Sequence, residues 1–492
     1  MASFIPIASD ATLFGPRPFG TLESHLSKRT QKELGRLRAI LRDTKKTLRD
    51  VSDSQLTSLW TDLLSDAVNL LRAMDRRERW PSGPGIFQTP VFGGPDLTRY
   101  FVQFQEFEQL LYGAGAHYRD HVIHVLRVWM LGARILICDN GKSGWKALRF
   151  SPPFVVSSLD GTKRSDREAV GSSRDVGSPF ELFEDISMVE VLASWTIIAL
   201  CHDLGYPLEK AREINGKVEE MLAQFGDLGF EGIRYRFQPH HQSLNENLLE
   251  TLASKIVGRE YEGGTDPAKR TTTLSNGRAP GLRFGTARQQ KYYSKFAKSL
   301  QNYDHGIMGC VLLTKTLLYF IEADRDGGGR LSLEYEDARQ LATRIEILRA
   351  IASHTCSDVY HVHLNSLAFL LIFCDEAQEW DRPTLSDMRA PVPKGQVKKV
   401  VIKKADISGS SFAFIVEFKE DQEDLAKYAK YKFRQFDKLL RCAVDGGERT
   451  GSFVVAFKCG GDEYKYDLSC TREEGRRIVA TKPRGVRFDI WK

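Results

Sequence analysis

The chain has 492 residues, a length typical of two to four domains. Its 42% hydrophobic and 27% charged residues are a globular balance, which argues against extensive disorder. No uninterrupted apolar run reaches the ~18–20 residues that cross a bilayer, and the first residues, MASFIPIASD, lack the features of a signal peptide. The eight cysteines are scattered without a CxxC pair, which argues against a zinc finger and predicts a reduced, cytoplasmic protein.

The net charge of +6 is unevenly distributed. The segment from Pro391 to the end contains 22 Lys and Arg against 15 Asp and Glu, so the basic excess lies there. Such a segment can bind phosphates, nucleic acid or a protein partner. The alternative is a well-solvated small domain, because the charges alternate in sign rather than forming a cluster.

Helical spacing of apolar residues dominates the first four fifths of the chain. Residues 24–80 are predicted to be helical, a Gly/Pro-rich break follows at 79–96, and 101–138 is again helical. A polar segment at 139–179 is interpreted as an inserted loop, and a second, basic loop is predicted at 258–290. Further helices are predicted at 181–204, 208–225, 243–257, 304–323, 334–354 and 363–380.

The spacing of apolar residues changes from a helical to an alternating pattern after a linker marked by Pro383, Pro391 and Pro393. Residues 397–407 and 411–418 alternate as strands do, 421–440 is an amphipathic helix, and two more strands follow around a Gly-Gly-Asp turn. This order predicts a small α+β domain with an antiparallel sheet. The expected organisation is mainly α: a helical extension at 1–100, a helical domain at 101–385 and the α+β domain at 396–492.

Histidines and aspartates recur at the ends of the apolar helices. His117, His121 and His124 are spaced four and three apart, which places them on one face of a helix. Imidazole nitrogens together with carboxylate oxygens suit a divalent cation such as Mn²⁺, Fe²⁺ or Zn²⁺. A carboxylate inside an apolar helix is costly unless a cation offsets it. The residues that fit this pattern are His124, His202, Asp203, His305, His354 and Asp375.

This pattern resembles the HD-domain metal-dependent phosphohydrolase superfamily. The resemblance is carried by HVLRVWMLG (124–132) and CHDLGYP (201–207), followed by His305, His354 and Asp375. The resemblance covers about 101–385 and implies an all-α bundle. It implies that His124, His202, Asp203 and Asp375 bind a first metal ion. In members with two ions, further histidines contribute ligands, and His305 and His354 match that role.

The sequence departs from the family pattern in three ways. The segment between Asp203 and His305 is unusually long, and Tyr206 replaces a lysine that often follows the HDxG sequence. The adjacent pair His240-His241 precedes His305, which is the wrong order for the cyclic-dinucleotide branch. We therefore do not expect activity on cyclic di-GMP.

The expected function is metal-dependent hydrolysis of a phosphoester in a nucleotide or a nucleotide-like signal. Asp203, His305 and His354 are the candidate catalytic residues, the last two as general acids if they are not fully committed to metal. One or two divalent ions are expected per chain, with Mn, Fe, Zn, Mg and Ni equally compatible; we favour two.

Several features leave alternatives open. Lys210 and Arg212 are candidates for binding a substrate phosphate, although the start of an amphipathic helix also faces solvent. Arg270, Arg278, Arg283 and Arg288 of the second loop can close over phosphates or form an exposed linker. The alternative functions are a non-catalytic nucleotide sensor and a nucleic-acid phosphodiesterase. Neither a membrane partner nor any particular oligomer is predicted, and a homo-oligomer is compatible with the sequence.

Overall fold

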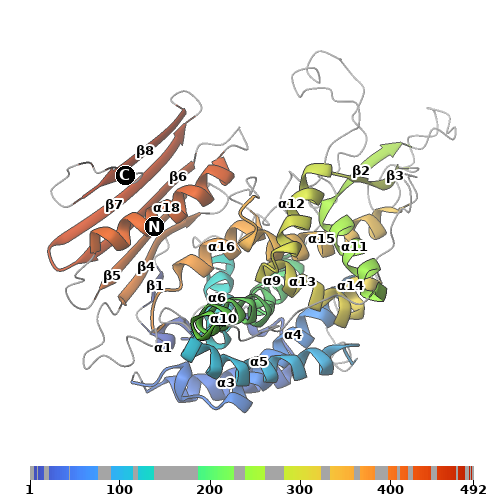
Figure 1. Ribbon diagram of the computed structural model, residues 1–492, viewed down its shortest axis with the longest axis horizontal. Helices are drawn as coiled ribbons and strands as arrows, with labels where there is room; N and C mark the ends of the chain where they lie inside the picture. The colour runs from blue at the N-terminus through green and yellow to red at the C-terminus, as the bar shows by residue number, and fades with distance from the viewer. Residues whose placement is uncertain are drawn as a thin grey trace.

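Helices account for most of the described residues in the computed structural model, and a smaller sheet lies beside them (Figure 1). The structure describes residues 5–7, 9–15, 22–43, 45–75, 90–114, 120–137, 187–226, 239–260, 282–322, 333–358, 366–382, 397–406, 411–418, 425–444, 451–471, 475–482, 487 and 489. The mainly α prediction is confirmed at this coarse level. The described helices are α1 (Asp10–Leu13), α3 (Lys28–Leu41), η1 (Leu48–Asp50), α4 (Asp53–Asp75), α5 (Gly94–Ala114), α6 (Val122–Ile137), α9 (Met188–Cys201), α10 (Tyr206–Leu222), η4 (Ala223–Phe225), α11 (Pro239–Ala253), α12 (Gln290–Gln301), α13 (His305–Thr316), α14 (Leu318–Ile321), α15 (Tyr335–Thr355), α16 (Leu367–Ala377) and α18 (Leu425–Val444).

The centre of the helical part is α9, which packs on α4, α6 and α15. Ser187 begins this helix: its side chain accepts from the backbone N–H of Glu190, and the Glu190 side chain bonds back to the Ser187 backbone. From Val189 to Cys201 every residue of α9 is buried. The stretch Met188–Phe225 is long and apolar enough to cross a membrane, but 94% of its most apolar window is buried inside the protein, as in a core helix.

One predicted helix is interrupted. The continuous helix expected at 101–138 is two helices, α5 and α6, and α6 begins only at Val122. His121 therefore precedes α6 and does not share a helical face with His124, while His117 lies outside the described residues. The signal for a break was present in the sequence as Gly113 and Gly115.

Two strands occupy the ends of the segment predicted as a basic loop. Strands β2 (Ser254–Glu260) and β3 (Leu282–Arg288) pair antiparallel, from Ser254 opposite Arg288 to Glu260 opposite Leu282. The loop prediction at 258–290 is therefore wrong at its ends, and the helix predicted to reach 257 ends at Ala253 as α11. Buried Phe284 fixes the ribbon on the helical part and exchanges backbone hydrogen bonds with Leu333. The polar loop predicted at 139–179 lies outside the described residues.

The main sheet has six strands in the order β1-β4-β5-β6-β7-β8. They are β1 (Ile5–Ile7), β4 (Val397–Asp406), β5 (Ser411–Phe418), β6 (Gly451–Cys459), β7 (Asp462–Thr471) and β8 (Gly475–Thr481). The purely antiparallel prediction is wrong at one pair, because β5 and β6 run parallel. Helix α18 joins these two strands as a crossover, and a crossover allows parallel pairing where a hairpin does not.

The N-terminal segment contributes to this sheet. Strand β1 pairs antiparallel with β4, with Ile5 opposite Ile402. Residues 1–100 are therefore not a purely helical extension. The three-part division itself stays a prediction, since the expected linker at 383–396 lies outside the described residues.

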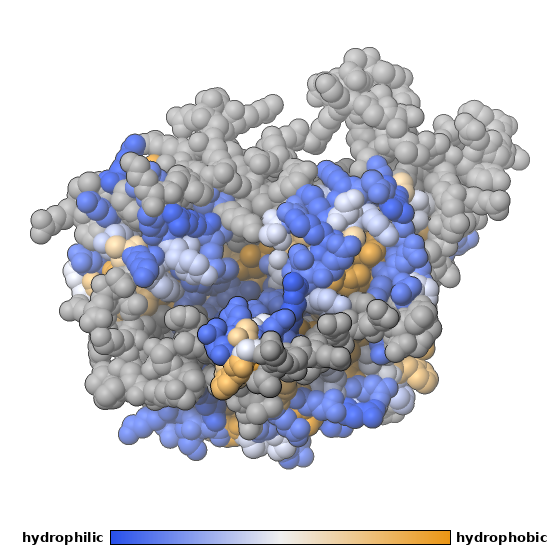
Figure 2. Space-filling view, viewed as in Figure 1, coloured by the Kyte–Doolittle hydropathy of each residue, from blue (hydrophilic) through white to orange (hydrophobic). Residues whose placement is uncertain are grey.

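The sheet and the helical part share one continuous apolar core. Helix α18 covers one face of the sheet, and α16 lies between the sheet and the other helices (Figure 1). On the face viewed in Figure 2, the described surface is mainly hydrophilic, with smaller apolar areas between. Of the cysteines whose side chains the structure describes, all are buried and free; they are Cys201, Cys310, Cys356, Cys374 and Cys459.

Candidate metal centre

The six residues predicted to bind metal come together where five helices meet. Helix α6 supplies His124, the end of α9 leads into His202 and Asp203, and α16 supplies Asp375. His305 is the first residue of α13, and His354 lies in the last turn of α15.

The first group consists of His124, His202 and Asp203, whose candidate ligand atoms lie within 4.8 Å of one another. Asp375 joins it, with its Oδ1 2.8 Å from His124 Nε2. His202 Nε2 lies 3.3 Å from Asp203 Oδ2. These side chains provide two imidazoles and two carboxylates, a donor set suited to a divalent cation.

The second group consists of Asp203, His305 and His354, also within 4.8 Å of one another. The two histidine Nε2 atoms are 3.1 Å apart. They lie 3.4 Å (His305) and 3.8 Å (His354) from Asp203 Oδ1. Asp203 therefore belongs to both groups, with Oδ2 toward one and Oδ1 toward the other.

Backbone carbonyls orient two of the four rings. The Nδ1 of His202 lies 2.9 Å from the carbonyl oxygen of Ala199, and the Nδ1 of His354 lies 2.5 Å from that of Ile351. A carbonyl only accepts, so in each ring Nδ1 carries the proton and Nε2 presents a lone pair. These are the contacts that fix the metal-binding tautomer of a histidine.

Two side chains that sequence reasoning missed orient the other rings. Gln378 Oε1 lies 2.6 Å from Nδ1 of His124, and Glu209 Oε2 lies 2.8 Å from Nδ1 of His305. Glu209 also accepts from the backbone N–H of His305, at 2.9 Å. The spacing of Gln378, three residues after Asp375, was a usable signal. The position of Glu209 gave none, because its partner lies about a hundred residues away.

The donor set fits a cation. His202 Nε2 is buried and has no hydrogen-bond partner among the described residues. The Nε2 atoms of His305 and His354 face each other while each Nδ1 has an acceptor, so two lone pairs meet unless a proton or a cation lies between them. A buried polar atom without a partner is costly, and a metal ion removes that cost at each of these nitrogens.

The electrostatics keep the ligands in their metal-binding forms. Burial lowers the pKa of His202 to about 4, so its imidazole is neutral at pH 7. Burial disfavours the charged form of Asp203, but His202 and the other nearby histidines outweigh it and hold the pKa of this carboxyl well below its usual value. His305 differs: burial opposes its charge, yet the hydrogen bond that its ring donates to Glu209 raises its pKa overall.

Comparison with known proteins adds no assignment to this geometry. No protein-family model, no curated protein and no solved structure matches the chain. The case for a metal centre therefore rests on the donor atoms and their surroundings.

Two residues of the cluster are partly exposed. The side chains of Asp375 and His305 are 31% and 17% exposed, whereas His124 and His202 are fully buried. Asp375, which was expected to be buried in its apolar helix, is therefore only partly buried. Among the described residues of the cluster, Asp375 and His305 are the most accessible to a substrate.

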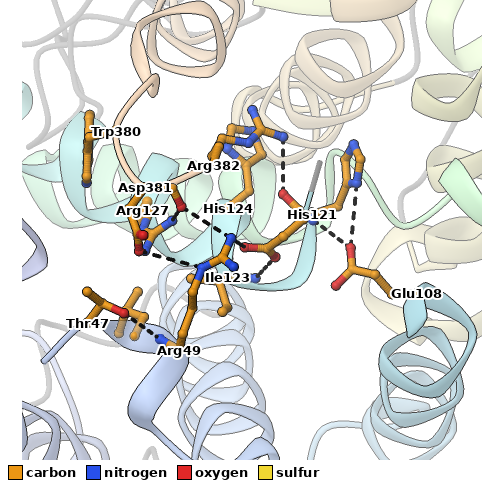
Figure 3. Close-up of polar contacts among 12 residues, drawn as sticks. Thr47, Arg49, Glu108, His121, Ile123, His124, Arg127, Trp380, Asp381 and Arg382 are labelled. Carbon is orange, nitrogen blue, oxygen red and sulfur yellow. Dashed lines mark hydrogen bonds and ion pairs between the residues drawn. The ribbon is translucent and has the colours of Figure 1, made fainter. Parts of the chain in front are cut away.

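Tyr206 and His121 line the cluster without belonging to it. The rings of His121 and Tyr206 stack with centroids 3.8 Å apart, and Tyr206 meets the His305 ring edge-on at 5.1 Å. The backbone N–H of His121 donates to Glu108 Oε1 at 2.6 Å (Figure 3). Burial lowers the pKa of His121 to about 3, so this ring is neutral.

An ion-pair network beside the histidine-aspartate cluster connects α6 to the segment that follows α16. The fully buried guanidinium of Arg127, one turn after His124, bonds both carboxylate oxygens of Asp10, at 2.8 and 2.7 Å. It also bonds the carbonyl oxygen of Asp381 at 2.8 Å and the Asp381 carboxylate (Figure 3). Trp380 Nε1 donates to Asp10 Oδ1 at 3.3 Å. This network fixes the positions from which two ligand-bearing helices present their side chains.

The predicted phosphate-binding residues have other partners. Lys210 Nζ pairs with Glu213 at 2.7 Å and lies 5.1 Å from the ring centre of Tyr206. Arg212 donates to the carbonyl oxygen of Asn302 at 2.9 Å. No described contact joins either residue to the six clustered ones, and their role in substrate binding stays a prediction.

Of the four loop arginines, Arg288 pairs with Glu250 at 2.7 Å. Arg270 and Arg278, and the side chain of Arg283, lie outside what the structure describes. Their predicted closure over substrate phosphates is therefore untested.

Proposed function

We propose that this protein is a metal-dependent phosphohydrolase of the HD superfamily, acting on a phosphoester of a nucleotide or a nucleotide-like compound. The observation that carries the proposal is the sharing of Asp203 between two groups of imidazoles, each of which has its Nδ1 on a hydrogen-bond acceptor and its Nε2 toward the cluster. His124, His202, Asp203 and Asp375 would hold one ion, and Asp203, His305 and His354 a second. Bound divalent ions supply Lewis acidity toward a phosphoryl oxygen and lower the pKa of a water.

The protein's own groups divide the remaining work. Glu209 holds His305 in one orientation by accepting from both its ring and its backbone. The exposed side of Asp375 and His305 admits the phosphoester, while burial of His124 and His202 excludes water from the opposite side. Tyr206 offers an aromatic face beside His305 on which a base or sugar can lie. If His305 binds no metal, its raised pKa suits it to donate a proton to the leaving oxygen.

Metal stoichiometry and a substrate screen test the proposal together. We expect about two Mn²⁺ per wild-type chain by elemental analysis, one after His354→Ala, and none after Asp203→Ala, because Asp203 serves both groups. His25→Ala, in the N-terminal helical region, is the matched control and should keep wild-type metal content. One ion in wild type and in His354→Ala alike would support a mononuclear site in which His354 transfers protons.

The screen uses nucleoside triphosphates, cyclic nucleotides, alarmones and short single-stranded DNA and RNA. Turnover of one nucleotide class that Asp203→Ala abolishes supports the proposal. Binding without turnover would identify a nucleotide sensor, and cleavage of the oligonucleotides alone would identify a nucleic-acid phosphodiesterase. Wild-type turnover by Asp203→Ala would refute the assignment of the site.

A further inference from the structure

The end of α16 and the two residues that follow it present polar side chains to two different parts of the protein. Asp375 and Gln378 contact the histidine cluster. Glu376 and Glu379, each one position further along, contact Lys432 of α18 instead. Because the sheet unit (α18 with strands β1 and β4–β8) lies against α16, one short stretch joins the metal centre to that unit (Figure 1).

Lys432 is a buried cation between two carboxylates. Its Nζ lies 2.7 Å from Glu376 Oε2 and 2.5 Å from Glu379 Oε1, with the Glu376 carbonyl oxygen at 3.4 Å. Lys432 is 7% exposed and Glu379 8% exposed. Burial of Lys432 opposes its charge, but the two carboxylates raise its pKa overall, so it is charged at neutral pH.

Aromatic contacts fix the same helix from the sheet side. Phe373 of α16 meets Phe414 of β5 and Phe453 of β6 edge-on, with ring centroids 5.8 and 6.0 Å apart. Helix α18 is itself anchored to the sheet, because Tyr466 of β7 donates to Asp437 at 2.9 Å. The position of α16 is therefore set from the sheet unit as well as from the helical part.

The arrangement has an electrostatic consequence. Without the Lys432 ammonium, the buried carboxylate of Glu379 and the partly buried carboxylate of Glu376 lose the cation described between them. Such groups are costly to keep buried, and the lowest-cost response is to move the stretch 376–379 toward solvent. Gln378 lies in this stretch and Asp375 directly precedes it, so both would move, which disturbs the first metal group. The second group, on α13 and α15, has no described contact with Lys432.

We propose that Lys432 is a positioning residue through which the sheet unit sets the metal affinity of the first group. The inference rests on the metal centre proposed above. It extends that proposal by assigning the sheet unit a role in holding one of the two proposed ions.

The test is a Mn²⁺ titration of the full-length chain by calorimetry, at a temperature at which every variant is folded. In Lys432→Met we expect one of the two sites to bind at least about tenfold more weakly, a loss typical of groups that orient metal ligands, while the other stays within twofold of wild type. Lys458→Met is the matched control, because Lys458 forms an exposed pair with Glu463 in the same sheet unit at 3.2 Å. It should leave both sites unchanged.

Two further variants separate positioning from a general loss of stability. Glu379→Gln combined with Lys432→Met removes one stranded carboxylate and should restore part of the lost affinity. Phe453→Leu weakens the aromatic hold on α16 without changing charge, and should weaken the same site by a smaller factor. This variant also keeps the idea testable if Lys432→Met does not fold.

The outcomes discriminate clearly. Selective weakening of one site supports the inference. Equal weakening of both sites, or no change in either Lys432→Met or Phe453→Leu, overturns it while leaving the proposed function intact. A wild-type chain that binds no Mn²⁺ overturns both proposals.

Discussion

Removing the buried guanidinium of Arg127 tests the network beneath the metal centre. Arg127 is 0% exposed and Asp10 is 1% exposed. In Arg127→Met, Asp10 keeps hydrogen bonds from the backbone N–H of Leu48 at 2.9 Å and from Trp380, but loses its only described cation. Removing one partner of a buried ion pair typically costs about 3–5 kcal/mol, because the other charge stays buried and uncompensated.

We expect urea unfolding of Arg127→Met at pH 7 to show a loss of about 3–5 kcal/mol in the free energy of unfolding. Arg36→Met is the control: Arg36 is 54% exposed and pairs with Glu33 at 2.6 Å, a contact worth roughly 0.5 kcal/mol or less. Adding Asp10→Asn to Arg127→Met should recover part of the loss. A loss below about 1 kcal/mol for Arg127→Met would refute the reasoning, because the pair would then be dispensable.

The pH dependence gives a second check with a defined sign. In wild type, burial opposes the charge of Asp10, but Arg127 outweighs it and lowers the pKa of this carboxyl, so the pair stabilises the fold at neutral pH and that contribution is lost in acid. Without Arg127, burial alone acts and raises the pKa of Asp10. The folded variant then takes up a proton more readily than the unfolded chain as pH falls. The difference in stability between the two proteins should therefore narrow between pH 7 and pH 4.5.

Three other predictions follow from separate features. In Gly205→Ala the new Cβ would lie 2.1 Å from the carbonyl oxygen of His305. We expect thermal melting to show a loss of about 1–3 kcal/mol in the free energy of unfolding, and we expect weaker metal retention. Gly216→Ala is the control and should not destabilise the protein, because the space around Gly216 is open. Burial raises the pKa of Asp66 to about 6, so the contribution of this group to stability should fall as pH rises from 4 to 6, by up to about 3 kcal/mol. Asp66→Asn should lack this contribution, so the difference in free energy of unfolding between the two proteins, from urea unfolding, should change between pH 4.5 and 7.5. Removing metal with a chelator should lower the melting temperature, since the donor atoms of both groups then face one another without a cation, and adding Mn²⁺ should restore it. If chelation leaves the melting temperature of metal-loaded protein unchanged, the proposed site is wrong.

The helical part was predictable because its signal is local. Apolar spacing located most of the described helices to within a few residues, although it missed the break between α5 and α6. The candidate ligands were found at or near the ends of apolar runs. The candidate ligands are spread along the chain from His124 to Asp375, but each lies at or near a helix end or on an apolar helix. Because apolar helices pack side by side, these residues could be predicted to share one site. What sequence could not supply was the second partner of each ring, such as Glu209, which depends on how α10 lies against α13.

The errors have a common cause in long-range contacts. Lys432 lies in an amphipathic helix and resembles an ordinary solvent-facing lysine until two carboxylates of α16 are placed against it. The three residues of β1 are too few to show an alternating pattern. The parallel pairing of β5 with β6 is an exception, because the helix α18 between the two strands was a local signal for a crossover connection.

The pairing of β1 with β4 has a consequence for how the chain is made. Ile5 and Ile402 are about 400 residues apart, so this strand leaves the ribosome long before its neighbour exists. Closing so long a loop is slow, and it is completed only after the intervening helices have packed. The first strand is thus added last, and refolding monitored at the edge of the sheet should lag behind refolding monitored at Trp195 in the centre of the helical part.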